Sequence, residues 1–260
     1  MPVCDLGDVQ LNYTDQGDGP PVVFAHALGC SQKIWEPILP LMPKGLRLIS
    51  YDARGHGASS VPEGPYSMGA LVRDAERLLD ALEVRDCVFV GLSMGGMVAQ
   101  GLAVKRLDQV RAMVLSNTAA KIGQPKQWHE RANIARSDGV GALCDMAMPR
   151  WFTKKFLSAG LDAPWREMMA ATPVEGYCGG CAAIAGTDFY TTTASLTLPT
   201  LAIAGAYDGT TPADLVRETA DLVKGSRFHL FRNAGHMPCV EIPEDYTAVL
   251  TEFLTDIGHA

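Results

Sequence analysis

Short apolar runs and amphipathic segments follow one another along much of the chain. Four largely apolar runs, at residues 22–25, 46–51, 87–92 and 110–115, are typical of strands buried on both faces of a sheet. Between the second and third runs, a segment that begins after Ser67 carries apolar residues at helical spacing: Met68, Leu71, Val72, Ala75, Leu78, Leu79 and Leu82. This alternation predicts an α/β protein with a mainly parallel sheet flanked by helices.

Two weaker patterns precede the second run. Residues 9–13 alternate between apolar and polar side chains, which predicts a short strand. Residues 34–41 place Ile34, Trp35 and Ile38 at helical spacing, and we expect an amphipathic helix there, punctuated by prolines.

The alternation breaks between residues 117 and 198. This stretch has no convincing buried strand, and its apolar residues recur at helix-like spacing between prolines and glycines. So long a segment is too apolar for a loop, so we expect a helical insertion over the sheet. The predicted organisation is a core formed by residues 1–118 and 197–260, with a helical cap at 119–196.

Composition restricts the partners more than the fold. The 260 residues have ordinary contents of hydrophobic (47%) and charged (20%) side chains, so the chain can form a full core. A net charge of −7 argues against nucleic acid and anionic membranes as partners and favours a small molecule. The sequence shows no targeting segment or membrane span, so we expect a cytoplasmic protein; it does not predict an oligomeric state.

Seven cysteines, an odd number without a spaced framework, fit a reducing compartment. Only Cys178-Gly-Gly-Cys181 resembles a motif. One such pair cannot complete a tetrahedral zinc site and does not follow a thioredoxin-like strand, so we interpret it as a closely packed helix start rather than a redox centre.

A Gly-x-Ser-x-Gly sequence joins the run at 87–92 to an apolar helical segment. In Gly91-Leu92-Ser93-Met94-Gly95, the flanking glycines allow the sharp strand-to-helix turn that exposes a nucleophilic serine. The N–H of Met94 would then be available to an oxyanion at the helix start. The alternative is an ordinary turn with a capping serine, because the motif alone is common.

Two further residues support a catalytic role for Ser93. After the insertion, a strand at 200–204 leads to Asp208, and a strand at 227–231 leads to His236. The carboxyl ends of parallel strands meet at one edge of a sheet, so both side chains are expected near Ser93. The order Ser, Asp, His is that of the α/β-hydrolase triad. His236 would act as general base and Asp208 would orient it.

The loop after the run at 22–25 is expected to supply the second oxyanion donor. We predict the N–H of Leu28 for this role, with the His26 ring holding the loop. His56, in the turn after residues 46–51, is interpreted as structural, and Asp52 and Arg54 are expected to pair there. No zinc spacing or Gly-rich phosphate motif is present, so neither a metal nor an organic cofactor is expected.

The chain resembles the α/β-hydrolase fold from Val22 to Leu254, and more closely the 3-oxoadipate enol-lactone hydrolase family. The resemblance rests on the elbow, on Tyr51-Asp52-Ala53-Arg54-Gly55-His56-Gly57-Ala58-Ser59, and above all on cap stretches: Ser116-Asn117-Thr118-Ala119-Ala120-Lys121-Ile122-Gly123, Trp128-His129-Glu130-Arg131, Arg150-Trp151-Phe152-Thr153 and Thr172-Pro173-Val174-Glu175-Gly176-Tyr177. One departure is the histidine in His26-Ala27-Leu28-Gly29, where similar enzymes often carry another polar residue.

The resemblance implies hydrolysis of 3-oxoadipate enol-lactone to 3-oxoadipate in the β-ketoadipate pathway of aromatic catabolism. The alternatives are another small-ester or lactone hydrolase, or a cofactor-free haloperoxidase-like perhydrolase with the same triad. A ligand receptor without turnover is a further class, against which an intact triad argues.

An acidic protein needs a local cation to bind an anionic lactone. Residues 119–170 carry eight basic and five acidic side chains, a net of +3, against −10 elsewhere. Most of these charges belong on solvated helix faces. Arg131 and Arg150 are the candidates to bind a carboxylate, because they lie beside Trp128 and Trp151, which would line an apolar pocket.

Overall fold

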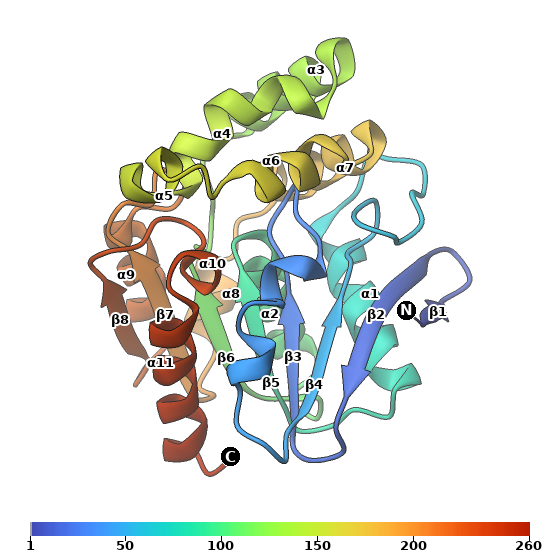
Figure 1. The fold of residues 1–260 in the computed structure, drawn as a ribbon. Coiled ribbons are helices and arrows are strands. Elements are labelled where there is room, and N and C mark those ends of the chain that lie inside the picture. Colours follow the sequence, from blue (N-terminus) through green and yellow to red (C-terminus); the bar gives the residue numbers. More distant parts are fainter. Residues whose placement is uncertain (1) are drawn as a thin grey trace.

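The computed structural model describes residues 2–260; Met1, where the predicted core begins, lies outside the described residues. An eight-stranded sheet has the order β1-β2-β4-β3-β5-β6-β7-β8 (Figure 1). The strands are β1 (Val3–Asp5), β2 (Gln10–Gln16), β3 (Pro21–Ala25), β4 (Arg47–Tyr51), β5 (Cys87–Leu92), β6 (Val110–Ser116), β7 (Thr200–Gly205) and β8 (Arg227–Phe231). β1 and β2 are antiparallel to their neighbours and β3 to β8 are parallel, so the predicted α/β-hydrolase architecture is confirmed.

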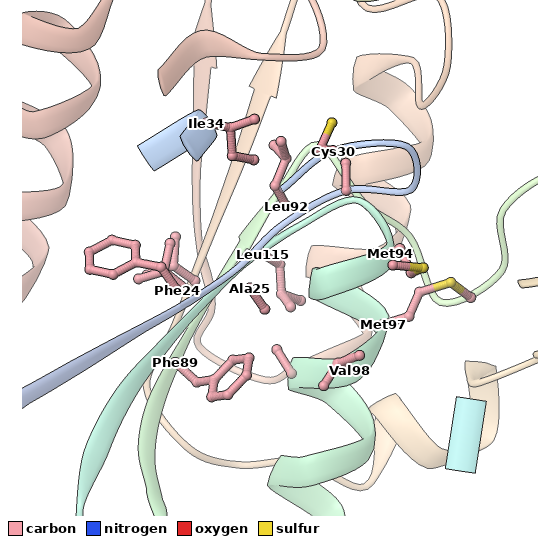
Figure 2. Packing of buried hydrophobic residues seen from close by; sticks show 14 of the residues in the cluster. Phe24, Ala25, Cys30, Ile34, Phe89, Leu92, Met94, Met97, Val98 and Leu115 are labelled. Carbon is pink, nitrogen blue, oxygen red and sulfur yellow. The ribbon is translucent and has the colours of Figure 1, made fainter. Parts of the chain in front are cut away.

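Five helices belong to the alternating part of the chain: α1 (Met68–Ala81), α2 (Met94–Lys105), α9 (Ala213–Leu222), α10 (Pro238–Glu241) and α11 (Pro243–Asp256). α1 buries the apolar face that its spacing predicts, and the Ser67 side chain accepts a hydrogen bond from Ala70 N–H at 3.1 Å, which caps the helix. α2 is almost wholly buried behind the sheet. Figure 2 shows how α2 packs: Met94, Met97 and Val98 lie on the same side of the strands as Phe89 and Leu115, whereas Phe24 points to the opposite side.

Between β6 and β7 the chain forms only helices. These are α3 (Pro125–Asp138), the 3₁₀ turn η3 (Val140–Leu143), α4 (Cys144–Trp151), α5 (Lys154–Ser158), α6 (Ala163–Ala170), α7 (Val174–Ala185) and α8 (Tyr190–Ala194). In Figure 1, α3 to α7 form a layer above the sheet, on the side to which β3 and β4 point, whereas α8 returns beside α2 and α9. The helices of this layer therefore face the carboxyl ends of the parallel strands.

Two details near the N-terminus differ from the prediction. The expected helix at 34–41 is wrong: the segment forms two short 3₁₀ turns, η1 (Gln32–Trp35) and η2 (Leu39–Leu41). Pro37 and Pro40 lack the N–H groups that a continuous helix would need there. The short edge strand β1 was not predicted.

The Cys-Gly-Gly-Cys stretch lies within α7, where glycines let the helix approach the core closely. A Cβ at Gly176 would lie 1.8 Å from the Gly55 carbonyl oxygen, and one at Gly180 would lie 2.4 Å from Leu28 Cδ1. Cys178 and Cys181 are buried and carry free thiols, and burial raises the pKa of both. The motif therefore serves helix packing, as interpreted from the sequence, but it lies in the middle of α7 and not at a helix start.

Candidate active site

Ser93 lies at a sharp turn between β5 and α2, in a left-handed backbone conformation with φ of 54°. A Cβ at Gly91 would lie 2.2 Å from the Gly95 carbonyl oxygen, and one at Gly95 would lie 2.1 Å from that of Ala25. Only glycine fits at either position, so the two glycines are what allow this geometry. The turn has the form of a nucleophile elbow, and Ser93 retains 6% of its surface exposed.

Asp208 and His236 meet although they follow different strands. Asp208 comes after β7 and His236 after β8, and the two side chains are almost completely buried. The His236 Nδ1–H donates to Asp208 Oδ2 at 2.8 Å, which leaves Nε2 without its proton and able to accept one. Within residues 2–260, no hydrogen bond joins Nε2 to Ser93 Oγ, so the third contact of the expected triad remains a prediction.

The Asp208 carboxylate accepts hydrogen bonds on both oxygens. Oδ1 accepts from the backbone N–H of Thr210 (2.7 Å) and Thr211 (2.9 Å), and Oδ2 accepts from Thr211 Oγ1 (2.8 Å) and Asn117 Nδ2 (2.9 Å) as well as from His236. Burial alone would raise the pKa of Asp208, but its interaction with His236 and the hydrogen bonds from His236, Asn117 and Thr211 outweigh burial, and the pKa is lowered. Asp208 is thus held as an anion.

Sequence reasoning missed Asn117 and Thr211 as partners of Asp208. Thr211 follows the aspartate by three residues, a local Asx-turn spacing that offered a signal. Asn117 is 91 positions away; its place after the run at 110–115 put it at the same edge of the sheet, but gave no sign that its amide would bind the acid.

The two predicted oxyanion donors lie at free backbone positions. Among residues 2–260, neither Leu28 N–H nor Met94 N–H donates a hydrogen bond, and Met94 begins α2, where the first N–H groups have no partner within the helix. Gly180 of α7 lies close to both side chains, since a Cβ there would be 2.4 Å from Leu28 Cδ1 and 3.5 Å from Met94 Sδ. Their role as an oxyanion hole remains a prediction.

His26 holds this loop, as predicted. Its Nδ1–H donates to the Ala27 carbonyl oxygen at 2.8 Å, and its Nε2 accepts from Ala53 N–H at 2.9 Å. Both ring nitrogens are therefore engaged by backbone groups. Burial lowers the pKa of His26, so the ring stays neutral while its hydrogen bonds link the two loops.

The neighbouring turn contradicts the expected Asp52–Arg54 pair. Arg54 donates to Asp74 of α1, from Nε at 2.5 Å and from Nη2 at 2.6 Å. Asp52 accepts instead from Gln32 N–H (2.7 Å) and Ala58 N–H (3.0 Å), among other groups. A carboxylate held between backbone donors is no longer free to meet the guanidinium two residues away.

Arg131 and Arg150 lie in one cleft of about 430 Å³, together with Trp128 and the Gly209–Thr210 segment beside Asp208. Arg131 stacks over Trp128 at 5.4 Å and donates from Nε to Tyr177 Oη at 3.2 Å. Burial and the charge of Arg131 lower the pKa of Arg150. Within residues 2–260 neither arginine forms a salt bridge, although the charge of Asp208 acts on Arg150 and Glu130 also lines the cleft. Neither Ser93 nor His236 lines this cleft.

The structure does not place Trp151 in this cleft. Its ring is buried and packs edge-on against Phe152, with the ring centres 6.4 Å apart. Its carbonyl oxygen accepts the His236 N–H at 2.7 Å. The expectation that the Trp151 side chain lines the substrate pocket beside Arg150 is therefore wrong for this cleft, and Trp151 meets the site through its backbone.

The end of α4 is hydrogen-bonded to the loop after β7, which carries Asp208 (the acid loop), and to the loop after β8, which carries His236 (the histidine loop). Besides the Trp151–His236 bond, the Arg150 carbonyl oxygen accepts Gly209 N–H at 2.9 Å. Glu241 of α10 adds a bridge, since Oε2 accepts Gly235 N–H at 2.5 Å and Oε1 accepts from Thr153 N–H and Oγ1, both at 2.8 Å. The acid loop, the histidine loop and the start of the α4–α5 connection are thereby joined.

Residues 2–260 contain neither a cluster suited to a metal ion nor a helix suited to a membrane. No group of three or more histidine, cysteine or acidic side chains is arranged to hold a metal ion. No helix in the described chain is both long and apolar enough to cross a membrane.

An elbow serine at the end of β5 and an Asp–His pair after β7 and β8, at one edge of a mainly parallel sheet, define the class of protein. The chain belongs to the alpha/beta hydrolase fold family, which matches it over residues 20–243, and it is a hydrolase. Within that family it is similar to 3-oxoadipate enol-lactonases, so the resemblance seen in the cap motifs is confirmed.

The individual relatives cover nearly the whole chain. 3-Oxoadipate enol-lactonase 2 of Acinetobacter baylyi is 34% identical, over 92% of this chain and 91% of that relative. The crystal structure of the enol-lactonase from Burkholderia xenovorans LB400 superposes with a TM-score of 0.94 at 33% identity, over 98% of this chain and 100% of that one. A non-heme chloroperoxidase of Kitasatospora aureofaciens is 27% identical, over 91% and 92%. The family match and these relatives support a hydrolase that acts on a small molecule.

Proposed function

We propose that the protein hydrolyses 3-oxoadipate enol-lactone to 3-oxoadipate, in the β-ketoadipate pathway of aromatic catabolism. The observation that carries the proposal is the pair of unpaired arginines, Arg131 and Arg150, in one cleft beside the Asp208 loop. The lactone bears an acetate side chain, and a carboxylate leaving water needs such a cationic partner. The names of the enol-lactonase relatives point to the same substrate.

The proposed chemistry proceeds through an acyl-enzyme. His236 Nε2 takes the proton of Ser93 Oγ as the oxygen attacks the lactone carbonyl, and Asp208 holds His236 in the required tautomer. The N–H groups of Leu28 and Met94 bind the oxyanion, a contact worth about 3–4 kcal/mol for each donor. Collapse breaks the ring C–O bond, and His236 passes its proton to the departing oxygen, which leaves as an enol that tautomerises to the ketone. Water, activated by His236, then cleaves the ester.

The layer from α3 to α7 is assigned a substrate-binding role in this proposal. Residues 119–196 act as a cap on a core formed by residues 1–118 and 197–260. The cap contributes Arg131, Arg150 and Trp128 to the cleft, and the core contributes Gly209 and Thr210, which follow Asp208. The core also carries the reacting groups, which lie outside the cleft lining. The carboxylate would extend from the reacting ring toward the two arginines.

The test compares an anionic with a neutral substrate. For Arg131→Ala and Arg150→Ala we expect KM for the carboxylated lactone to rise about 10- to 100-fold, the loss of a charge-assisted contact. Hydrolysis of a neutral aryl acetate should stay within about twofold, because it has no charge to bind. Lys155→Ala, an exposed cation of α5 outside the cleft, is the matched control and should behave like the unchanged protein.

Other results would favour a different substrate or a different reaction. An equal loss on both substrates, or no loss for either arginine variant on the lactone, removes the carboxylate site and favours a neutral ester or lactone. The chloroperoxidase relative makes perhydrolysis the second candidate, in which hydrogen peroxide replaces water in attacking the acyl-enzyme. Assay of peracid formation from acetate and peroxide separates the two. Turnover that survives Ser93→Ala contradicts the serine mechanism itself.

A further inference from the structure

Asn117 lies directly after β6, at the edge of the sheet where Ser93, Asp208 and His236 follow their own strands. It is completely buried and has a left-handed backbone, with φ of 47°. Its backbone N–H donates to the Ile203 carbonyl oxygen of β7 at 2.7 Å. A positive φ is uncommon for a buried residue other than glycine, and it occurs often at functional sites.

The Asn117 amide contacts both loops of the site. Nδ2 donates to Asp208 Oδ2 at 2.9 Å and to the Gly235 carbonyl oxygen at 3.2 Å, so both of its hydrogens are used. Oδ1 accepts from Ser116 Oγ at 3.2 Å, which fixes the orientation of the amide. The side chain therefore connects the acid directly to the residue that precedes His236.

We propose that Asn117 is a positioning residue for the hydrolytic reaction, which keeps the Asp208 carboxylate aligned with His236 Nδ1 and fixes the spacing of the two loops. The proposal rests on the proposed triad. Thr211 also donates to Asp208 Oδ2 and its Oγ1 lies 3.4 Å from His236 Nδ1, but it belongs to the acid's own loop. Asn117 differs because its backbone is fixed to β7, outside both loops. An amide suits the position because it donates without adding charge.

A carboxylate at position 117 would change the electrostatics of the pair. The charged groups around His236 are Asp208, Arg150 at the end of α4, with Arg131 beyond it, and Glu241, which binds Gly235 N–H. An aspartate in place of Asn117 would lie within hydrogen-bond distance of Asp208, where two carboxylates cannot both ionise freely and share a proton.

Two substitutions test the role. Asn117→Gly removes the amide and keeps the backbone conformation, since glycine tolerates a positive φ. We expect kcat on the lactone to fall about 10- to 100-fold with KM within about threefold, the signature of a misaligned base rather than of lost binding. Asn117→Asp should add an ionisation to the pH profile of kcat/KM, because the shared proton is released within the working range.

Glu83→Gly is the matched control for the backbone. Glu83 is exposed and also has a positive φ, 53°, but it lies in the turn before β5, at the end opposite Ser93. It should leave kcat and the pH profile unchanged. If Asn117→Gly keeps kcat within twofold of the unchanged protein, or if the Asn117→Asp profile superimposes on it, the positioning role is overturned.

A spectroscopic measurement separates this proposal from the proposed function. The downfield proton NMR signal of the His236 Nδ1–H···Asp208 bond, identified by its loss in His236→Gln, reports the alignment without any turnover. We expect Asn117→Gly to shift or broaden it and Glu83→Gly to leave it in place; an unshifted signal in Asn117→Gly contradicts the role. Failure of the lactone assay in the unchanged protein would affect only the proposed substrate.

Discussion

Two residues of this site have backbone conformations that are unfavourable for residues other than glycine. Ser93 and Asn117 both have positive φ values, 54° and 47°, and each follows a strand of the parallel sheet. Such backbones cost about 1–3 kcal/mol and persist only where the surroundings hold them. At Ser93 the surroundings are two glycines and the start of α2, and at Asn117 they are two loops. The strain lies where side chains must face the site.

His56 is the residue at which pH should act on stability. Burial, and then the nearby His26, lower the pKa of His56 from 6.5 to about 3. The unfolded chain therefore binds more protons than the folded one between about pH 6.5 and pH 3, so stability falls as pH falls through that window. By pH 5 the loss from this group is about 2 kcal/mol.

His56→Gln should remove this dependence. We expect a lower unfolding free energy at pH 7.5, by about 1–2 kcal/mol for the lost contact with the Arg54 carbonyl, and a smaller decline from pH 7.5 to pH 5 than in the unchanged protein. Activity should change little, whereas His236→Gln should lower kcat by several orders of magnitude. Urea unfolding at the two pH values measures the first effect; an equally steep decline in His56→Gln would show that other groups carry it.

Residues could be predicted where a motif or the strand order sets their position, and not from closeness in sequence. The elbow glycines and the Asp–His pair follow from motif and strand order, and the structure brings Asp208 and His236 within 2.8 Å. The Asp52–Arg54 pair was a guess from proximity in sequence, and it failed because Asp74 and backbone donors compete more effectively. Asn117 also follows a strand that ends at this edge, but the strand order does not say which side chain there will bind the acid.

At the scale of elements, the contact of α7 with the core loops depends on the absence of side chains. A Cβ at Gly176 would lie 1.8 Å from the Gly55 carbonyl oxygen and 2.5 Å from Gly55 Cα, and backbone cannot move aside as a flexible side chain can. The helix therefore approaches the turn that contains His56 more closely than any other residue at position 176 would permit.

Gly176→Ala should destabilise the protein despite the better helix propensity of alanine. We expect a loss of about 1–3 kcal/mol from the forced displacement of α7. Gly69→Ala on α1 is the matched control, because the nearest atom to its added Cβ is 3.8 Å away; it should gain about 0.5–1 kcal/mol. Thermal unfolding of both variants measures the difference, and a Gly176→Ala variant as stable as Gly69→Ala would contradict the tight contact.

Helices and strands were predictable where the pattern of apolar residues was not interrupted. The four buried runs and α1 were located from sequence to within a residue or two, because burial on both sheet faces or on one helix face leaves a clear pattern. The segment after β3 carries helical spacing as well, but its prolines break it into 3₁₀ turns. In that segment the missing N–H groups of the prolines decided the structure, although the apolar residues have helical spacing.

For the molecule as a whole, charge is unevenly distributed. Residues 119–170 carry a net charge of +3 and the remainder −10. An anionic substrate would be repelled by the body and attracted near Arg131 and Arg150, whose charges no salt bridge within residues 2–260 offsets. At about 0.1 M salt, interactions beyond about 10 Å are screened, so the arginines dominate close to the cleft.

This distribution predicts a salt dependence. Raising ionic strength from about 0.05 M to about 0.5 M should lower kcat/KM for the anionic lactone several-fold, because it screens the attraction to the cleft. A neutral ester should be unaffected, and the Arg131→Ala/Arg150→Ala double variant should lose the dependence. Rates that rise with salt on the lactone would mean that repulsion by the acidic body governs its approach.

The hydrogen bonds from the end of α4 also bear on how such proteins can be recombined. Exchanging the insertion between relatives is an obvious route to a new specificity, since it leaves the proposed triad of Ser93, Asp208 and His236 in the recipient. Here the Arg150 and Trp151 carbonyls hold Gly209 and His236, and Thr153 shares Glu241 with Gly235. A graft of residues 119–196 would replace these anchors along with the specificity, and the donor segment would have to match the recipient's loops. A chimera that keeps residues 150–153 native and exchanges only α3 and α7 avoids this dependence.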